Sequence, residues 1–286
     1  MKQLLILSGK GGTGKTTVAT SFIKLSKAKA YADCDVDAPN LHLINNENKE
    51  YDHKAFYGLD KAYIDKDLCI GCGLCYQQCR FDAIEKLDDK YQVDYFGCEG
   101  CSLCAEICPT NAIKMKKAQA GDLMLAKNDE VFSTAKLKMG SGNSGLLVME
   151  VKNRLKKNSD SDFAIIDGSP GIGCPVIASL SGADTVLIVS EPSASGISDL
   201  KRIIETAKRF NPKLAVCVNK YDSHLENTEK IIDFCDKKSI DFVGLIPNDQ
   251  MAIKAVNNNK AVVEYDCKAK RAIEDVYSKT MKVFLK

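Results

Sequence analysis

The stretch Gly9-Lys10-Gly11-Gly12-Thr13-Gly14-Lys15-Thr16-Thr17 has the pattern GxxxxGK(S/T) and follows directly on the apolar run of residues 2–8. That run has the length and composition of a buried parallel strand, and residues 18–26 continue as a helix. In such a strand–loop–helix unit, backbone N–H groups and the start of the helix face the phosphates of a nucleotide. The stretch therefore predicts an α/β nucleotide-binding fold; the alternative is a glycine-rich turn that only looks like a phosphate loop.

The same stretch assigns roles to individual side chains. Lys15 is expected to reach the β and γ phosphates, and the Thr16 hydroxyl to ligate Mg²⁺. The full set of expected nucleotide contacts in this loop is Gly9, Gly11, Gly12, Thr13, Gly14, Lys15, Thr16 and Thr17.

The rest of the chain alternates between strand and helix patterns. Strands are expected at residues 28–32, 163–167, 184–190, 214–219 and 241–246, and helices at 146–155, 198–210, 226–238 and 268–285. Residues 45–60 are polar without a clear period and are interpreted as a connecting segment. This βαβ progression predicts a mostly parallel sheet covered by helices on both faces.

Aspartates follow two of these strands. Asp33, Asp35 and Asp37 alternate after the second strand, and their carboxylates would share one face in extended backbone. Residues 164–171 resemble a Walker B strand that runs into a switch loop, in which Asp167 holds Mg²⁺ through water. An incidental strand end is the alternative for Asp167.

The cysteine pattern is concentrated in one block. Of the 13 cysteines, eight lie between residues 69 and 108, where CxxCxxCxxxC occurs twice at an offset of 29 residues. Residues 83–84 and 112–113 repeat the dipeptide Ala-Ile at the same offset, so the block is a duplicated unit. Three neighbouring thiolates and a remote fourth are the bacterial ferredoxin pattern, in which the fourth cysteine of each run ligates the other cluster.

Two [4Fe–4S] clusters are therefore expected, and zinc or a disulfide framework is the alternative. Cluster one would take Cys69, Cys72, Cys75 and Cys108, and cluster two Cys98, Cys101, Cys104 and Cys79. Pro109 follows the second run as the pattern asks, whereas Arg80 replaces the corresponding proline of the first run. Arg80 is either a solvated side chain or a charge that raises the potential of the neighbouring cluster.

Composition excludes several classes of function. The net charge of +2 gives no electrostatic argument for nucleic-acid binding. No stretch approaches the ~20 apolar residues of a membrane span, and residues 1–7 are too short for a signal peptide. We therefore expect a cytoplasmic protein without stable membrane insertion, whose cysteines serve as metal ligands or buried thiols.

The extra lysine of the phosphate loop, Lys10, resembles the deviant Walker A motif of the MinD/ParA/nitrogenase iron protein class of P-loop ATPases. With the 33–42 segment, the switch aspartate and the cysteine block, nearly the whole chain resembles MinD superfamily ATPases containing an inserted ferredoxin domain. The resemblance implies an ATPase domain formed by residues 1–59 and 119–286 and a ferredoxin domain at residues 60–118. It further implies that Lys10 reaches the partner's phosphates in an ATP-sandwich homodimer. Asp35 would orient the attacking water or contact the metal shell, with Asp37 as its substitute.

The resemblance also implies adenine contacts at two strand ends, from Asn219, Pro247 and Asp249. Asn219-Lys220-Tyr221-Asp222 equally matches the guanine-reading NKxD motif, so GTP stays open, with Asp222 as the discriminating side chain. The implied catalytic set is Lys10, Lys15, Asp35 and Asp167.

The leading functional hypothesis is a Mg-dependent ATPase that couples a nucleotide-switched homodimer to electron transfer with an unidentified redox partner protein. The alternatives are an iron–sulfur carrier of the Mrp type and a redox-sensing, MinD/ParA-like positioning ATPase.

Four further features are interpreted from their local sequence. Cys174 either bridges a dimer through a cluster or is a packing or redox thiol, and Cys34, Cys217, Cys235 and Cys267 are interpreted as buried small hydrophobes. The glycine-rich residues 140–145 are either a hinge or an ordinary surface loop. The carboxy-terminal helix is expected to pack its apolar face on the sheet, although the corresponding helix of MinD binds membrane.

Overall fold

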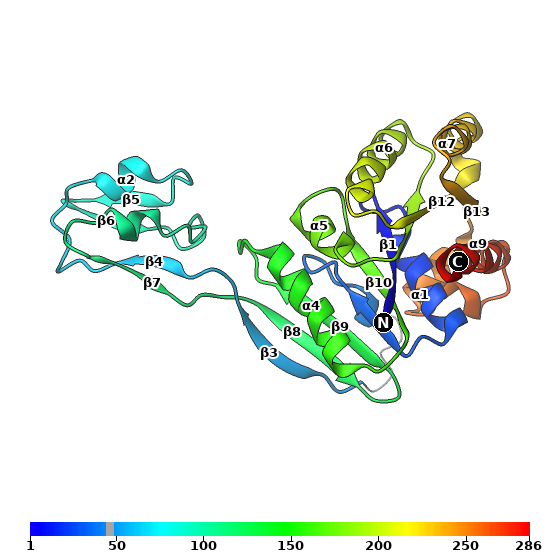
Figure 1. Ribbon diagram of the computed structural model, residues 1–286, viewed down its shortest axis with the longest axis horizontal. Helices are drawn as coiled ribbons and strands as arrows, with labels where there is room; N and C mark the ends of the chain where they lie inside the picture. Colours follow the sequence, from blue (N-terminus) through cyan, green and yellow to red (C-terminus); the bar gives the residue numbers. More distant parts are fainter. Residues whose placement is uncertain (44–48) are drawn as a thin grey trace.

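The computed structural model describes residues 1–43 and 49–286. Its centre is a nine-stranded sheet in the order β13-β12-β11-β1-β10-β2-β9-β8-β3 (Figure 1). The strands are β1 (Lys2–Ser8), β2 (Ala30–Asp33), β3 (Asp52–Tyr57), β8 (Gln119–Lys127), β9 (Val131–Leu137), β10 (Phe163–Pro170), β11 (Thr185–Ser190), β12 (Lys213–Asn219) and β13 (Asp241–Ile246). From β13 to β9 neighbouring strands are parallel, and β8 and β3 add an antiparallel edge. The expected mostly parallel sheet is confirmed.

Helices cover both faces of this sheet, as predicted. One face carries α1 (Lys15–Ser26), α8 (Gln250–Asn257) and α9 (Lys268–Leu285), and the other carries α4 (Ser144–Asn158), α5 (Cys174–Leu180), α6 (Ala194–Lys208) and α7 (Leu225–Lys237). Because the central strands are buried on both sides, they are continuous apolar runs such as Leu4–Leu7. Three 3₁₀ turns, η1 (Leu41–Leu43), η2 (Tyr221–Ser223) and η3 (Val262–Glu264), lie in the connections.

The apolar face of α9 packs against the sheet. Ile273, Val276 and Phe284 are at most 2% exposed and belong to the same core cluster as α1. This confirms the interpretation of α9 as an ordinary surface helix with one buried stripe. Across the described part of the chain, no helix combines the length and apolarity needed to cross a bilayer.

Three elements differ from the sequence-based expectation. Residues 52–57, expected as part of an irregular connection, form edge strand β3, which pairs with β8. Only Phe56 of this strand is buried, so the strand has no apolar alternation to recognise. The helices α5 and α8, of seven and eight residues, were not predicted. Residues 45–48 of the expected connection lie outside the described residues.

The cysteine block folds as a small unit that stands apart from the large sheet, beyond the ends of β3 and β8 (Figure 1). Its elements are β4 (Lys61–Ile64), α2 (Leu74–Gln78), β5 (Ile84–Leu87), β6 (Lys90–Val93), α3 (Leu103–Glu106) and β7 (Ile113–Lys116). Adding 29 to the bounds of β4 and β5 gives those of β6 and β7. The strands pair between repeats, β4 with β7 and β5 with β6, so neither half completes a sheet alone.

The duplication extends to backbone conformation. Left-handed residues recur at the same offset, with φ of 70° and 71° at Gly71 and Gly100 and of 49° and 52° at Asp82 and Asn111. The hydrogen bond from Asp65 N–H to the Ala112 carbonyl (2.8 Å) likewise repeats as Asp94 to Ala83 (2.8 Å). The unit therefore consists of two copies of one backbone structure, related by the same offset as the sequence repeat.

Candidate functional site

A cleft of ≈ 690 Å³ opens where the carboxyl ends of the parallel strands meet, the usual ligand position in open α/β sheets. It brings together segments that are far apart in the sequence. The sequence-predicted residues that line it are Gly11, Gly12, Gly14, Lys15, Thr16, Thr17, Asp35, Asp37, Asn219, Pro247 and Asp249. Switch-loop residues Ser169 and Pro170 complete the wall.

The phosphate loop has the backbone that its glycines permit. Gly12 and Gly14 adopt φ of 79° and 89°, a left-handed conformation that costs other residues roughly 1–2 kcal/mol. A methyl group on Gly14 would lie 2.2 Å from Nδ2 of Asn219, whereas the space around Gly12 is open. The helix α1 begins immediately afterwards at Lys15, so its N-terminus faces the cleft.

Lys15 lies among buried carboxylates. Its Nζ is 2.7 Å from Oδ1 of Asp167 and 4.0 Å from Oδ2 of Asp35, with side chains 6%, 0% and 17% exposed. Burial alone would lower the pKa of Lys15, but the charges of Asp167, Asp33 and Asp35 outweigh it and raise this pKa. The lysine is therefore charged and ready to meet phosphate oxygens.

The same carboxylates fit a magnesium ion. Oδ2 of Asp167 is buried without a hydrogen-bond partner, a costly state that a metal-bound water would relieve. Thr16 lines the cleft, and its hydroxyl lies 3.5 Å from Nζ of Lys15, the ion-pair partner of Asp167. A carboxylate and a hydroxyl are hard oxygen ligands of the kind that Mg²⁺ takes beside nucleotide phosphates.

The three alternating aspartates do not share one face, because β2 ends at Asp33. Asp33 is fully buried and accepts hydrogen bonds from the backbone N–H groups of Asp35, Asn40 and Leu41 at 2.9–3.0 Å. Burial and the neighbouring charge of Asp167 raise the pKa of Asp33 to about 7. Asp33 thus shapes the loop, Asp35 points to Lys15, and Asp37 is exposed.

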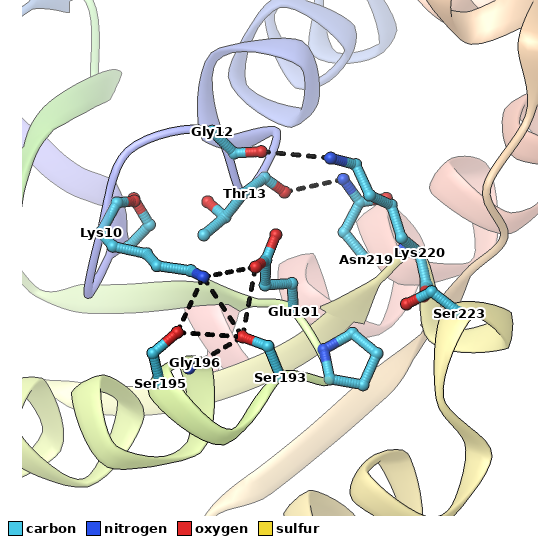
Figure 2. Close-up of polar contacts among 12 residues, drawn as sticks. Lys10, Gly12, Thr13, Glu191, Ser193, Ser195, Gly196, Asn219, Lys220 and Ser223 are labelled. Atoms are coloured by element: carbon cyan, nitrogen blue, oxygen red, sulfur yellow. Dashed lines mark hydrogen bonds and ion pairs between the residues drawn. The ribbon is translucent and has the colours of Figure 1, made fainter.

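Lys10 lies on the side of the phosphate loop that faces α6 (Figure 2). Its Nζ is 2.5 Å from Oε1 of Glu191 and within 3.2 Å of the hydroxyls of Ser193 and Ser195. Burial opposes ionisation of Glu191, but the hydrogen bond and charge of Lys10 outweigh it and lower the pKa of this carboxyl. Sequence reasoning did not identify these partners, which lie more than 180 residues from Lys10 and carry no motif.

The expected base-contact residues, Asn219, Pro247 and Asp249, line the same cleft as the phosphate loop. Asn219 donates from Nδ2 to the Thr13 carbonyl (2.7 Å), and Lys220 donates to the Gly12 carbonyl (3.2 Å; Figure 2). The carboxylate of Asp249 accepts from the N–H groups of Met251 and Ala269, so it caps α8 and joins α9 to it.

Asp222, the side chain that would read guanine, is directed to the backbone. It accepts a hydrogen bond from the Asn248 N–H at 2.8 Å. The residues that line the cleft, as far as the structure describes them, do not include Asp222.

The eight clustered cysteines surround two cavities of the small unit. One is lined by Cys69, Cys72, Cys75 and Cys108, and we call it the distal cavity. The other, the proximal cavity, is lined by Cys79, Cys98, Cys101 and Cys104, with Cys75 reaching both. These four-thiol sets match the two sets expected from the ferredoxin pattern.

The donor chemistry of these cavities fits iron–sulfur clusters. No group of three or more Cys, His, Asp or Glu side chains in the described residues is arranged to hold a single metal ion. A mononuclear zinc site would need all four sulfurs ≈ 2.3 Å from one centre. Burial raises the pKa of Cys104 to about 11, and the positive charge of bound iron would reverse that effect.

The remaining cysteines differ in exposure. Cys34, Cys217 and Cys235 are buried, as interpreted, and burial raises their pKa values to about 12, 12 and 11. Cys267 instead is only partly buried and caps α9, where its Sγ accepts from the Lys270 N–H. Cys174 is exposed at the start of α5.

Comparisons with known proteins agree with this division of the chain. Residues 62–115 match the family model of a 4Fe-4S dicluster domain. The chain is 32% identical to an uncharacterized protein of Methanocaldococcus jannaschii, over 97% of this chain and 95% of that one. It is 24% identical to the septum site-determining protein MinD of Bacillus subtilis (91% and 81% covered) and 23% identical to an iron-sulfur cluster carrier protein of Pyrococcus abyssi (97% and 84%).

Among solved structures, the cell division ATPase MinD of Pyrococcus furiosus superposes with a TM-score of 0.59 at 16% identity, covering 99% of both chains. At this identity the likeness concerns the fold: a MinD-like α/β sheet with helices on both faces. The expected fold class is therefore confirmed, with a 4Fe-4S domain at residues 62–115.

Proposed function

Because this chain belongs to the MinD superfamily of P-loop ATPases that contain an inserted 4Fe-4S dicluster domain, we propose that it couples a nucleotide-switched homodimer to electron transfer. ATPase activity itself is supported by the MinD relatives. The observation that carries the finer proposal is that one chain holds both a nucleotide cleft with a Lys15–Asp167 pair and two cavities of four cysteines. A nucleotide cleft does not require cysteine cavities, and cysteine cavities do not require a nucleotide cleft. Their presence in one chain therefore supports coupling between them.

The nucleotide roles follow from the geometry of the cleft. Lys15 and the glycine backbone are proposed to hold the phosphates, Thr16 and Asp167 to hold Mg²⁺, and Asp35 to orient the attacking water. Asn219, Pro247 and Asp249 are proposed to surround the base, the last through its backbone because its carboxylate is already bonded. We propose ATP as the nucleotide, supported by Asp222, whose carboxylate accepts from the Asn248 N–H and does not line the cleft.

Lys10 is proposed to exchange partners during the cycle. In the single chain it pairs with Glu191. In an ATP-bound homodimer it would release Glu191 and contact the phosphates bound by the partner subunit. ATP would thereby favour the dimer, because the charge of Lys10 is paired with Glu191 in the monomer and with phosphate in the dimer.

Residues 1–59 and 119–286 are proposed as the ATPase domain and 60–118 as the ferredoxin domain. Cys69, Cys72, Cys75 and Cys108 are proposed to hold one cluster, and Cys79, Cys98, Cys101 and Cys104 the other. Bound [4Fe–4S] clusters supply one-electron transfer at potentials that the surrounding protein sets. The chain's part is to position both cavities and to change their surroundings or docking when nucleotide binds.

The test is an EPR-monitored redox titration of the anaerobically purified protein with and without Mg-ATP. We expect nucleotide to shift a cluster potential or to change the rate of electron transfer to an acceptor. Identical potentials and identical rates in both states would overturn the proposal.

A second function is favoured by one observation, the similarity to the iron-sulfur cluster carrier protein of Pyrococcus abyssi. A carrier would pass a cluster to an apo-protein. Four thiols around each cavity favour retention instead, since a complete ligand set leaves no position open for a recipient. Incubation of the loaded protein with an apo-ferredoxin separates the two functions: a carrier loses iron to the recipient, whereas an electron-transfer protein keeps it.

A further inference from the structure

One segment touches both functional parts of the molecule. Residues 137–145, here called the bridge segment, connect β9 to α4 and include the glycine-rich loop. At its start, the Leu137 N–H donates to the Val36 carbonyl at 2.9 Å, between Asp35 and Asp37. The next residue, Lys138, donates to the Ala120 carbonyl at 2.8 Å, which fixes the segment to β8.

The middle of the bridge segment lies against the ferredoxin unit. A methyl group on Gly142 would lie 2.6 Å from Oε2 of Glu99, and one on Gly140 would lie 2.9 Å from Cδ1 of Phe96. Glu99 stands between Cys98 and Cys101 and lines the proximal cavity. The absence of side chains at two glycines thus allows this close approach.

The distal cavity is bordered differently. Its glycines, Gly71 and Gly73, approach the Asp89 carbonyl and the Tyr91 hydroxyl. Both partners belong to the ferredoxin unit itself, so these contacts do not connect the distal cavity to the ATPase domain.

The end of the bridge segment lies against the switch region. A methyl group on Gly145 would lie 3.3 Å from both Cβ and the carbonyl oxygen of Cys174, the first residue of α5. This helix follows the short loop after β10, the strand that contains Asp167.

The helices α4 and α5 are also tied at the other end of α5. Lys152 of α4 donates from Nζ to the carbonyls of Ser179 and Ser181, both at 2.6 Å. These contacts join both ends of α5 to Gly145 and Lys152 of α4, so we expect a displacement of the switch loop to carry the bridge segment with it.

We infer that the bridge segment transmits the nucleotide state of the Asp35 and Asp167 loops to the proximal cavity, so that nucleotide changes the properties of this cavity and leaves the distal one unchanged. This inference rests on the proposed coupling of nucleotide to electron transfer and adds which cavity responds and through which residues. The physical requirement is that nucleotide binds one arrangement of the switch and bridge more tightly than another.

The experiment uses the full-length protein with both clusters loaded. The potentials of the two clusters are measured by EPR-monitored titration with Mg²⁺ alone and with Mg²⁺ and a non-hydrolysable ATP analogue. Cys101→Ser and Cys72→Ser assign the signals, because each alters the ligands of one cavity. In the wild type we expect a nucleotide-dependent shift of the proximal cluster only.

Two variants interrupt the bridge at its two contacts. Gly145→Ala requires Cys174 to shift by a few tenths of an ångström, and Gly142→Ala displaces the exposed Glu99 carboxylate from the bridge segment. Both variants should lose the nucleotide-dependent shift while binding the analogue with unchanged affinity. Ser141→Ala and Ser144→Ala are matched controls in the same segment and should keep the shift. If a glycine variant fails to fold, Glu99→Ala tests the same contact from the exposed side chain opposite.

Hydrogen exchange of residues 138–145 supplies a readout that does not depend on the clusters. We expect the analogue to change exchange there in the wild type. A distal response, or Gly142→Ala and Gly145→Ala variants that keep the nucleotide-dependent shift, would overturn the inference while leaving the proposed function intact. A wild type in which neither cluster responds and electron-transfer rates stay constant would overturn the proposed function itself.

Discussion

The pair formed by Lys15 and Asp167 explains why the cleft is ready for a charged ligand. Both side chains are buried and separated by 2.7 Å, and one oxygen of Asp167 still lacks a partner. A buried ion pair of this kind contributes little net stability compared with apolar packing, because removing both charges from water is costly. The position of this pair, at the carboxyl edge of the sheet, is therefore explained by ligand binding and not by a contribution to folding stability.

Asp167→Asn tests this interpretation. The variant keeps the shape of the side chain but removes the charge that would orient metal-bound water. We expect Mg-dependent nucleotide binding or phosphate release to fall by roughly 10–100-fold, the usual effect of losing such a metal-orienting group. Isothermal titration with and without Mg²⁺ measures it; unchanged Mg²⁺ dependence would show that Asp167 does not serve the metal.

Asp35 and Asp37 provide an internal comparison. Asp35 lies 4.0 Å from Lys15, whereas Asp37 is exposed. Asp35→Asn should therefore reduce the rate of phosphate release by about 10²-fold or more, as loss of a group that positions a nucleophile does. Asp37→Asn should leave the rate near that of the wild type, and the opposite order would transfer the role to Asp37.

At the scale of elements, patterns of consecutive residues predicted the helices and strands that depend mainly on local sequence. The strand β1, the phosphate loop and α1 lie within 26 consecutive residues, and their pattern fixed both structure and site. The edge strand β3 was missed because only one of its six side chains is buried, and α5 and α8 were missed because they are short. The partners of Lys10 could not be found from the sequence, since only the fold brings Glu191 beside it.

The repeated glycines of the ferredoxin unit give an element-scale prediction. Methyl groups on Gly71 and Gly100 would lie 2.3 and 2.4 Å from the carbonyl oxygens of Asp89 and Asp60, in addition to the cost of a left-handed φ. Gly71→Ala should lose the distal cluster, and Gly100→Ala the proximal one, as measured by iron content and EPR.

The control for this pair is Gly182→Ala. Gly182 has the same left-handed conformation, with φ of 76°, but open space around it, so the substitution costs only the roughly 1–2 kcal/mol of backbone strain. Full iron content is expected in this variant. Iron loss there as well would mean that backbone strain in general, and not the local collision, releases the clusters.

At the scale of the whole molecule, Lys10 connects one chain to its proposed partner subunit. Lys10→Ala should remain monomeric with Mg-ATP in light-scattering measurements, because no lysine then reaches the other subunit's phosphates. Glu191→Gln should dimerise at a lower ATP concentration than the wild type, since the charge that retains Lys10 is gone. Dimerisation of Lys10→Ala with wild-type ATP dependence would assign the subunit contact to other residues.

The pairing of β3 with β8, the two strands from which the ferredoxin unit extends, leads to a further prediction. Tyr57 and Gln119 are paired in β3 and β8, so a two-residue turn could join them directly. Replacing residues 58–118 by Asn-Gly should leave a folded protein that binds nucleotide and contains no iron. Circular dichroism and nucleotide titration measure the result; an unfolded product would show that the large sheet depends on the inserted unit.

The same β3–β8 pair suggests how an ATPase chain with an inserted ferredoxin unit could arise. Beyond Tyr57 and Gln119, Lys61 faces Lys116 in β4 and β7, so the unit enters and leaves through neighbouring points. In evolutionary terms, β3 and β8 form an interrupted hairpin whose tip has been exchanged for a ferredoxin. A single insertion at a hairpin tip leaves the order of every strand in the large sheet unchanged, and a 4Fe-4S domain is thereby joined to a P-loop ATPase domain without redesign of either.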